Sequence, residues 1–160
     1  MKEPRMATAA VPKVAQPVFR HILVPTDFSH RSEAAVSYAL QLAKQAHAQL
    51  TLLHVLPEPS ALDYTLGGFP ETEQLRAKEE ASSLLHEEVA HAKRTFLEID
   101  SRLRTGLDLR HEILNTAKEI SADLLVLTTH KFAGWKKLLF GSDTEKILEQ
   151  APCPILILRC

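Results

Sequence analysis

The sequence predicts an α/β fold: a single doubly wound domain in which a parallel sheet carries helices on both faces. Three observations predict it. Short apolar segments alternate along the chain with longer segments of helical periodicity. The continuous apolar run at residues 124–127 suits a strand that is covered on both faces. Finally, 160 residues are enough for one ordinary globular domain and too few for two of typical size.

Composition and charge restrict the classes of partner. The chain is 45% hydrophobic and 24% charged, and its net charge of -1 gives no reason to expect nucleic acid or an anionic membrane as a partner. Cys153 and Cys160 form no C-x-x-C pair, which indicates reduced thiols and a cytoplasmic setting. Residues 1–18 lack the apolar stretch of a secretory signal. We expect them to form a disordered N-terminal tail ahead of one domain at 19–160.

The first strand is expected at residues 21–26, where Pro25 should mark its end because proline is poorly placed inside a central ladder. A tight connection follows, in which Ser29 is the expected N-cap of a helix. That helix is predicted over 30–47, because apolar residues recur on one helical face at Ala35, Val36, Ala39, Leu42, Ala43 and Ala46.

A second strand is predicted at 49–55, followed by a connection at 56–70 that is long for a compact domain. Residues 72–95 predict a long amphipathic helix with Leu75, Leu85, Val89 and Ala92 on its apolar face. Residues 97–103 alternate between apolar and charged side chains, the period of a strand with one wet face. This alternation favours an edge position in the sheet.

Gly106 and Asp108 lead into a third helix, which carries Ile113, Leu114, Ala117 and Ile120 at helical spacing. The buried strand at 124–127 comes next. Ser142 and Glu145 then stand in the S-x-x-E spacing of a capping box, which predicts a helix start. Pro154 to Arg159 closes the chain as a fifth strand.

The carboxyl ends of these strands carry the candidate site. Ligands of doubly wound sheets bind beyond those ends, which here carry residues 25–27, 54–55 and 128–130. Gly141 and Ser142 at a helix start are typical of phosphate sites, because free N–H groups and the positive end of the helix dipole converge there. On spacing alone, a plain helix start is an equally good interpretation.

Several motifs together resemble the universal stress protein family. They are P-T-D-F-S after the first strand, L-L-H-V in the second, A-D-L-L-V-L-T-T-H in the fourth, L-L-F-G-S-D-T-E-K-I-L at the last helix and A-P-C-P-I-L-I-L-R at the end. The resemblance implies an adenine nucleotide alpha hydrolase-like fold with strand order 3-2-1-4-5. It also implies a homodimer, commonly formed through the last strand (Pro154–Arg159 here), and a bound ATP in many members.

The resemblance also implies a nucleotide site. In ATP-binding members the fourth strand leads into G-x-x-G, nine residues and then G-[ST]. Aligned on Gly141 and Ser142, the first two glycine positions hold Thr128 and Lys131. Asp27 matches an aspartate that contacts the nucleoside. The cofactor-binding residues carried over from the family, or placed beside them, are Pro25, Thr26, Asp27, Val55, Leu127, Thr128, Lys131, Gly141 and Ser142.

The two replaced glycines alter the phosphate end of this site. Thr128 adds β-branched bulk, and Lys131 adds a side chain where backbone would approach the phosphates. Lysine still binds phosphate as a point charge, whereas Asp143 beside Ser142 would repel a triphosphate. The resemblance, taken with these replacements, therefore implies an adenine-nucleotide cleft without tight ATP binding. Mg²⁺ is expected only if a nucleotide is bound.

The sequence signals for other kinds of site are weaker. For His54 and His130 two interpretations remain open, contact with a ligand or a hydrogen-bonded histidine at a strand end. His86 and His91 lack the spacing of metal ligands on a helix, so no metal site is predicted. The loop around Trp135 is either a lid for a partner or a segment that folds its aromatic side chains onto the sheet.

The resulting hypothesis is a dimeric stress-response protein that acts by binding, without catalytic residues. Two alternatives are kept. One is a weak nucleotide hydrolase that uses Asp27 and a divalent ion, and the other is an interaction scaffold independent of nucleotide, with protein partners that the sequence does not identify.

Overall fold

The computed structural model describes residues 19–60, 62, 65, 70–129 and 147–159. Strands and helices alternate in the predicted order. Their bounds are β1 His21–Pro25, α1 His30–Ala46, β2 Gln49–Pro57, α3 Glu71–Lys93, β3 Ile99–Gly106, α4 Leu109–Glu119, β4 Leu124–Thr129 and β5 Ile155–Arg159, and residues 147–150 are helical. The predicted tail at 1–18 and the predicted capping box at Ser142 lie outside the described residues.

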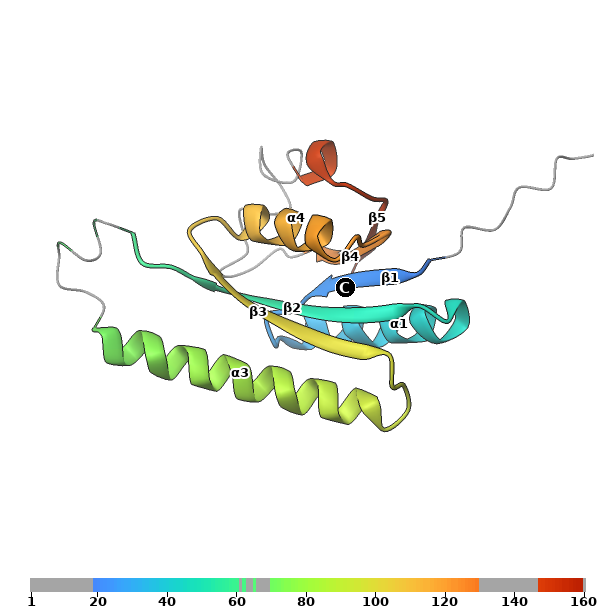
Figure 1. Cartoon of the computed structure of the whole chain (residues 1–160), viewed down its shortest axis with the longest axis horizontal. Coiled ribbons are helices and arrows are strands. Elements are labelled where there is room, and N and C mark those ends of the chain that lie inside the picture. Colours follow the sequence, from blue (N-terminus) through green and yellow to red (C-terminus); the bar gives the residue numbers. More distant parts are fainter. Residues whose placement is uncertain (1–18, 61, 63–64, 66–69, 130–146, 160) are drawn as a thin grey trace, which may run out of the picture.

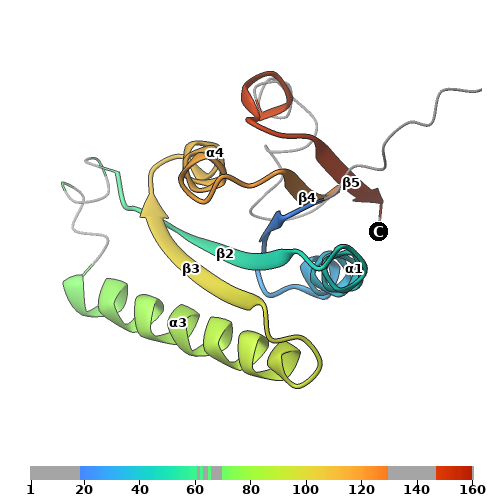
Figure 2. The same ribbon diagram turned by 45° about the vertical axis from the view of Figure 1, so that its right-hand side comes forward.

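The five strands form one parallel sheet in the order β3-β2-β1-β4-β5. Helices α1 and α3 cover one face of this sheet, while α4 and residues 147–150 cover the other (Figures 1 and 2). The predicted fold class, strand order and edge position of β3 are confirmed. Among the described helices, none combines the length and the apolar character that a membrane span requires.

Each face of the sheet has its own core. Alternate residues of β1 face opposite sides, so that Ile22 and Val24 belong to the core under α1 and α3, whereas Leu23 belongs to the core under α4. All three side chains are fully buried. Strands covered on both faces need apolar residues at every position, which is why the runs in β1 and β4 are continuous and do not alternate.

Two expectations about the apolar faces are wrong. Leu97, placed in the third strand, is 77% exposed, because β3 starts at Ile99 and the register Leu50↔Ile99 leaves no residue of β2 opposite it. Leu75, placed on the apolar face of the long helix, is 58% exposed. The core uses the later turns of α3, through Leu85 and Val89. Periodicity identifies a helical face but does not show how far along the helix the sheet reaches.

Strand β2 is longer than predicted. It continues past Val55 to Pro57, because β3 pairs with it as far as Pro57↔Gly106. The connection after the strand is correspondingly shorter than the predicted 56–70. Helix α4 starts directly after Gly106 and Asp108, as expected, and the structure shows that Asp108 is its N-cap, with the Asp108 carboxylate accepting from the backbone N–H of Arg110 at 2.9 Å.

Candidate functional site

Strands β1 and β4 are joined at their amino ends and separate toward their carboxyl ends. The Asp123 carboxylate accepts from the backbone N–H groups of Arg20 and His21, at 2.7 and 3.1 Å, and so ties the start of β1 to the start of β4. The ladder between the strands contains Ile22↔Leu124 and Leu23↔Leu125, and it ends there although both strands continue. This is the point where strand order reverses, and doubly wound proteins bind ligands there.

The turn between β1 and α1 is organised by a buried threonine. Thr26 is fully buried, and its backbone N–H donates to the Leu53 carbonyl of β2 at 2.8 Å. Its hydroxyl donates to Ser32 Oγ and accepts from the Phe28 N–H, both at 3.2 Å. Phe28 takes a left-handed backbone conformation with φ 61°, which is uncommon for an aromatic residue. The Thr26 hydroxyl therefore holds a tight turn in a conformation that would otherwise be unfavourable.

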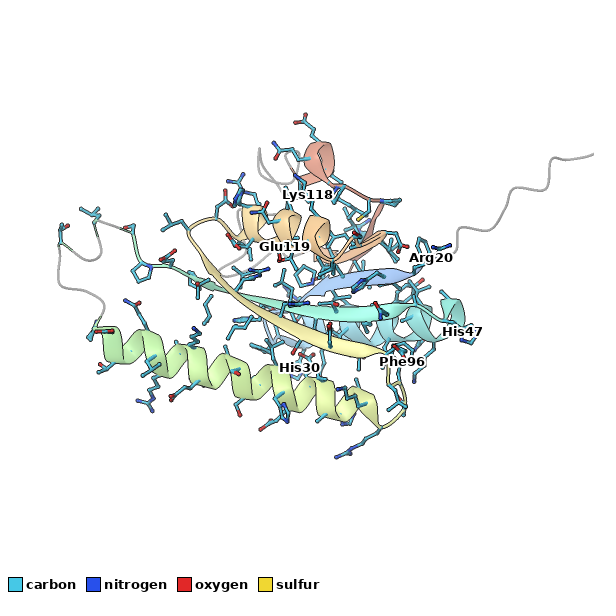
Figure 3. All side chains as sticks on the ribbon, viewed as in Figure 1. Arg20, His30, His47, Phe96, Lys118 and Glu119 are labelled. Carbon is cyan, nitrogen blue, oxygen red and sulfur yellow. The ribbon has the colours of Figure 1, made fainter. Side chains whose placement is uncertain are left out.

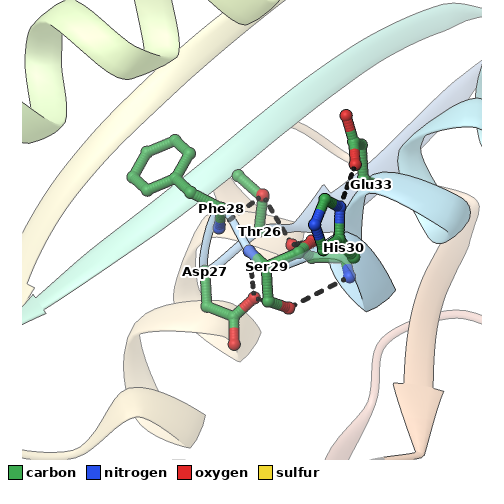
Figure 4. Close-up of polar contacts among 7 residues, drawn as sticks. Thr26, Asp27, Phe28, Ser29, His30 and Glu33 are labelled. Atoms are coloured by element: carbon green, nitrogen blue, oxygen red, sulfur yellow. Dashed lines mark hydrogen bonds and ion pairs between the residues drawn. The ribbon is translucent and has the colours of Figure 1, made fainter.

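Asp27 is bound to the helix cap that follows it. Its Oδ1 accepts from the Ser29 N–H at 3.1 Å and from the Ser29 hydroxyl at 2.6 Å. Ser29 is the N-cap of α1, as predicted, and its Oγ accepts from the Ser32 N–H at 3.3 Å. Figure 4 shows the Asp27 carboxylate and the Phe28 ring on opposite sides of the turn. The carboxylate is thus held in a fixed orientation by the start of α1.

His54 connects β2 to this turn. Its Nδ1 donates to the Thr26 carbonyl oxygen at 2.8 Å, and its ring stacks on Phe28 with 4.4 Å between ring centroids. A carbonyl only accepts, so the proton lies on Nδ1, and Nε2 of the neutral ring is an acceptor. Burial lowers the pKa of His54, although the Thr26 carbonyl and Asp27 oppose this effect. The predicted hydrogen bond of His54 is present, although β2 continues beyond this residue to Pro57, and contact between His54 and a ligand stays a prediction.

The remaining predicted pocket residues lie on the neighbouring strands. Pro25 ends β1 opposite Leu53 of β2. Val55 and Leu127 are buried in the core on the α4 side, where Ile147 also packs. Thr128 is 8% exposed in β4, where it pairs with Leu158 of β5. The sheet therefore places Pro25, Thr26, Asp27, Val55, Leu127 and Thr128 toward the carboxyl ends of β1, β2 and β4, and their role in binding a nucleotide stays a prediction.

Part of the predicted site lies outside the described residues. This applies to Lys131, Gly141 and Ser142, and also to His130 and the loop around Trp135. Within the described ranges, no group of three or more His, Cys, Asp or Glu side chains is arranged to hold a metal ion.

Sequence reasoning missed two features of this site. One is Ser32, whose hydroxyl meets Thr26 from inside α1 and donates to the Ser29 carbonyl at 2.9 Å. A polar residue among the apolar spacing of α1 was the available signal. The other is Asp123, which directly precedes the apolar run of β4. Its carboxylate accepts from the backbone N–H groups at the start of β1. Only the strand order reveals that partner.

The comparisons with known proteins agree with this geometry. The profile described as the universal stress protein family matches residues 19–159. The universal stress protein YxiE of Bacillus subtilis is 32% identical over 149 residues, which cover 89% of this chain and 100% of YxiE. A crystal structure of a family protein from Burkholderia pseudomallei has a TM-score of 0.69 at 28% identity, with 88% of this chain and 96% of that chain covered.

Two further structural neighbours were solved with nucleotides. A universal stress protein in complex with cAMP has a TM-score of 0.65 at 23% identity, covering 89% of this chain and 98% of its own. The Archaeoglobus fulgidus universal stress protein in complex with dAMP has a TM-score of 0.62 at 20% identity, covering 88% and 98%. At these identities the likeness concerns the fold.

Proposed function

This chain belongs to the universal stress protein family, and we propose that it acts as a binding protein for an adenine nucleotide carrying one phosphate group. The observation that carries the proposal is the separation of β1 from β4 after Leu23↔Leu125. Asp27 follows the end of β1, Thr128 lies near the end of β4, and Val55 lies on the adjacent β2. An open strand-order reversal with a fixed carboxylate suits a nucleoside, whose hydroxyl and amino groups can donate to that carboxylate.

The preference for one phosphate follows from Thr128 and Lys131. A glycine at position 128 would leave backbone for an anion to approach, whereas a buried β-branched side chain occupies that space. Lys131 supplies a single positive charge, which matches a monophosphate better than a triphosphate held by backbone amides. The neighbours solved with cAMP and dAMP support this choice, because both ligands carry one phosphate.

Calorimetry with AMP, cAMP and ATP, each with and without Mg²⁺, tests the proposal. We expect AMP or cAMP to bind more tightly than ATP, and Mg²⁺ to matter only for ATP. The variant Asp27→Asn keeps an oxygen that accepts from Ser29 but removes the charge, and it should weaken AMP binding roughly tenfold to hundredfold. Equal AMP binding by this variant and the parent would contradict the proposed role of Asp27.

A gain of function gives the complementary test. Thr128→Gly together with Lys131→Gly restores the glycines of the ATP motif and should raise ATP affinity relative to AMP. ATP binding that is already tighter than AMP binding in the parent protein would refute the monophosphate preference. Phosphate release that disappears in Asp27→Ala would instead favour the weak hydrolase.

We also propose that the chain forms a homodimer through β5. This strand is at the edge of the sheet, and none of its five residues is buried. Ile157 is 36% exposed. An apolar edge strand is a liability unless it is paired, so a second copy is the natural cover. Ile157→Lys should give a monomer in analytical ultracentrifugation, whereas Leu107→Lys, at a 74% exposed leucine elsewhere, should not. A monomeric parent protein would contradict the proposal.

We also propose that the protein is cytoplasmic, as its two cysteines indicate. In this setting Cys153 stays a free thiol, as it is in the structure. Labelling of the native protein with a membrane-impermeant maleimide in intact cells should leave Cys153 unmodified. Labelling without cell lysis would contradict it.

A further inference from the structure

A groove of about 940 Å³ lies between α1 and α3, on the face of the sheet opposite α4. We call it the α1–α3 groove. It begins beside the β1–α1 turn and continues to the end of α3. Its lining consists of Phe28, Ser29, His30, Glu33, Val36, Ser37, Leu40, Leu84, Glu87, Glu88, His91, Ala92, Arg94 and Thr95. Pro25, Val55, Leu127 and Thr128 are not among these residues, so the groove is separate from the proposed nucleotide site.

The floor of the groove is apolar. Val36 and Ala92 belong to the core above the sheet, and Phe28 and Leu40 pack against that core. Leu84 is 39% exposed at the wall formed by α3. A volume of this size with an apolar floor and a few polar groups is typical of sites for small organic molecules, which fall at about 300–1,000 Å³.

Three carboxylates are among the polar groups that line the α1–α3 groove. Glu33 comes from α1, while Glu87 and Glu88 come from α3, so carboxylates face the space from both helices. Within the described residues, the one ion pair in the lining joins His30 Nδ1 to Glu33 Oε2 at 3.0 Å (Figure 4). Figure 3 shows His30 on the side of the sheet where α3 lies. Arg94 is the one lining residue with a permanent positive charge.

Among the described residues that line the groove, Glu88 carries the one buried side-chain oxygen without a hydrogen bond. Its Oε2 is closed off from solvent and accepts no hydrogen bond from any described residue, although the side chain as a whole is only half-buried. An unpaired buried acceptor normally costs stability, and natural proteins keep few of them. Burial, with a smaller contribution from Glu33, raises the pKa of Glu88. A positively charged donor beside this carboxyl group would satisfy the unpaired oxygen and would stabilise the ionised form.

We propose that the α1–α3 groove binds a small organic cation, with an ammonium group beside Glu88 and Glu33 and an apolar chain along Val36 and Leu84. An ammonium group carries three donors and no acceptor, so it complements a pair of carboxyl groups in which one oxygen is unsatisfied. The apolar floor selects an organic cation over an inorganic one. A divalent metal is a poor fit, since the described residues contain no cluster of three ligands.

The probe that tests this proposal is n-octylammonium chloride, measured by isothermal titration calorimetry at neutral pH, with ammonium chloride and n-octanol as matched arms. We expect one octylammonium to bind per chain. Octanol, which lacks the charge, and ammonium, which lacks the chain, should each bind at least about tenfold more weakly, because each loses one of the two contributions. Octanol binding as tightly as octylammonium would overturn the proposal, and so would the absence of octylammonium binding.

Two variants locate the site. Glu88→Gln should weaken octylammonium binding roughly tenfold to hundredfold, since it removes the charge that the ammonium group meets. Ser37→Trp places an indole at an exposed position of the lining on α1 and should abolish binding by filling the groove. Binding that neither variant changes would show that the probe lies elsewhere and would refute the assignment.

Two control variants distinguish binding in the α1–α3 groove from nonspecific attraction to negative charge and from binding at the nucleotide site. Glu80→Gln removes an exposed carboxylate of α3 that does not line the groove, and it should leave octylammonium binding unchanged. Asp27→Asn should also leave it unchanged while weakening AMP. If Glu80→Gln weakens binding as much as Glu88→Gln, the attraction is nonspecific and the proposal fails.

Discussion

A carboxylate lies on each side of the β1–α1 turn, and the two differ in their hydrogen bonding. On the side toward the β1–β4 separation, Asp27 Oδ1 accepts two hydrogen bonds from Ser29, which belongs to the helix cap. On the side toward α3, Glu88 Oε2 is buried without a hydrogen-bond donor among the described residues. Both carboxylates lie near the start of α1, Asp27 in the turn that precedes this helix and Glu88 in the groove that Ser29 and Glu33 line.

The comparison distinguishes a group that is preorganised from one that is unsatisfied. A carboxylate held by the backbone and a hydroxyl is stable without ligand, and its orientation is already set when a nucleoside arrives. A carboxylate whose oxygen lacks a donor carries a cost in the unliganded protein, which a bound cation would remove. Sites that lower stability in this way are commonly retained for function.

The largest effect is expected from Thr26→Val. The substitution keeps the shape of the side chain but removes the hydroxyl that binds the Phe28 N–H and Ser32. It leaves buried polar groups without partners and should lower the free energy of unfolding by about 2 kcal/mol. Urea denaturation measures this. Thr105→Val, at an exposed position of β3, is the matched control and should change stability by less than about 0.5 kcal/mol.

A smaller effect of opposite sign is expected from Glu88→Gln. The raised pKa means that the folded protein favours the neutral carboxyl, so the stability it contributes is present below pH 4.5 and is lost as pH rises through the folded pKa. At pH 7 the variant should therefore be more stable, by less than about 1 kcal/mol because the half-buried group is partly screened by solvent.

Urea denaturation of both proteins at neutral and acidic pH measures the Glu88 effect. The gain should disappear below pH 4.5, where the glutamate becomes neutral in both the folded and the unfolded protein. Glu80→Gln on the same helix should show no comparable gain, because Glu80 is exposed. A Glu88→Gln protein that is less stable than the parent at pH 7 would indicate that this carboxylate is satisfied in solution.

The smallest effect concerns His54. Burial lowers its pKa, so the folded protein resists protonation of this ring. The stability that neutral His54 contributes is complete above its unfolded pKa of 6.5 and declines as pH falls below that value. The decline should amount to less than about 1 kcal/mol, because the ring is only part-buried and solvent screens it.

The difference between the parent and His54→Asn isolates this contribution. The variant does not titrate between pH 5 and 7.5, so its stability should fall less over that range than the stability of the parent, when both are followed by thermal unfolding in matched buffers. Parallel profiles for the two proteins would contradict the lowered pKa of His54.

Features that depend on nearest neighbours along the chain could be predicted from the sequence. The caps at Ser29 and Asp108 are local hydrogen bonds within three residues, and the structure contains both. Pro25 ends β1 because proline lacks the N–H that a ladder needs. Asp27, Val55 and Thr128 could be proposed as ligand-site residues because the carboxyl ends of parallel strands lie at the same end of the sheet, while their nucleotide roles come from the family resemblance.

Other features required the arrangement of the strands and helices. Leu75 and Leu97 satisfy the expected periodicities and are still exposed, because the length of β2 and the reach of the sheet are set by partners far away in sequence. The role of Asp123 depends on β4 lying beside β1. Local pattern carries no information about such partners.

By itself, the amino-acid sequence determined the order of elements, the cap at Ser29, the two-sided burial of β4 and, through its motifs, the family. These properties follow from backbone propensity and from the periodic placement of apolar side chains, which act over a few residues. Only the tertiary structure decided where β1 and β4 separate and that Glu33 and Glu88 face one groove. Those results depend on strand register and on the packing of α1 and α3 over the sheet, which bring together side chains that lie far apart in the chain.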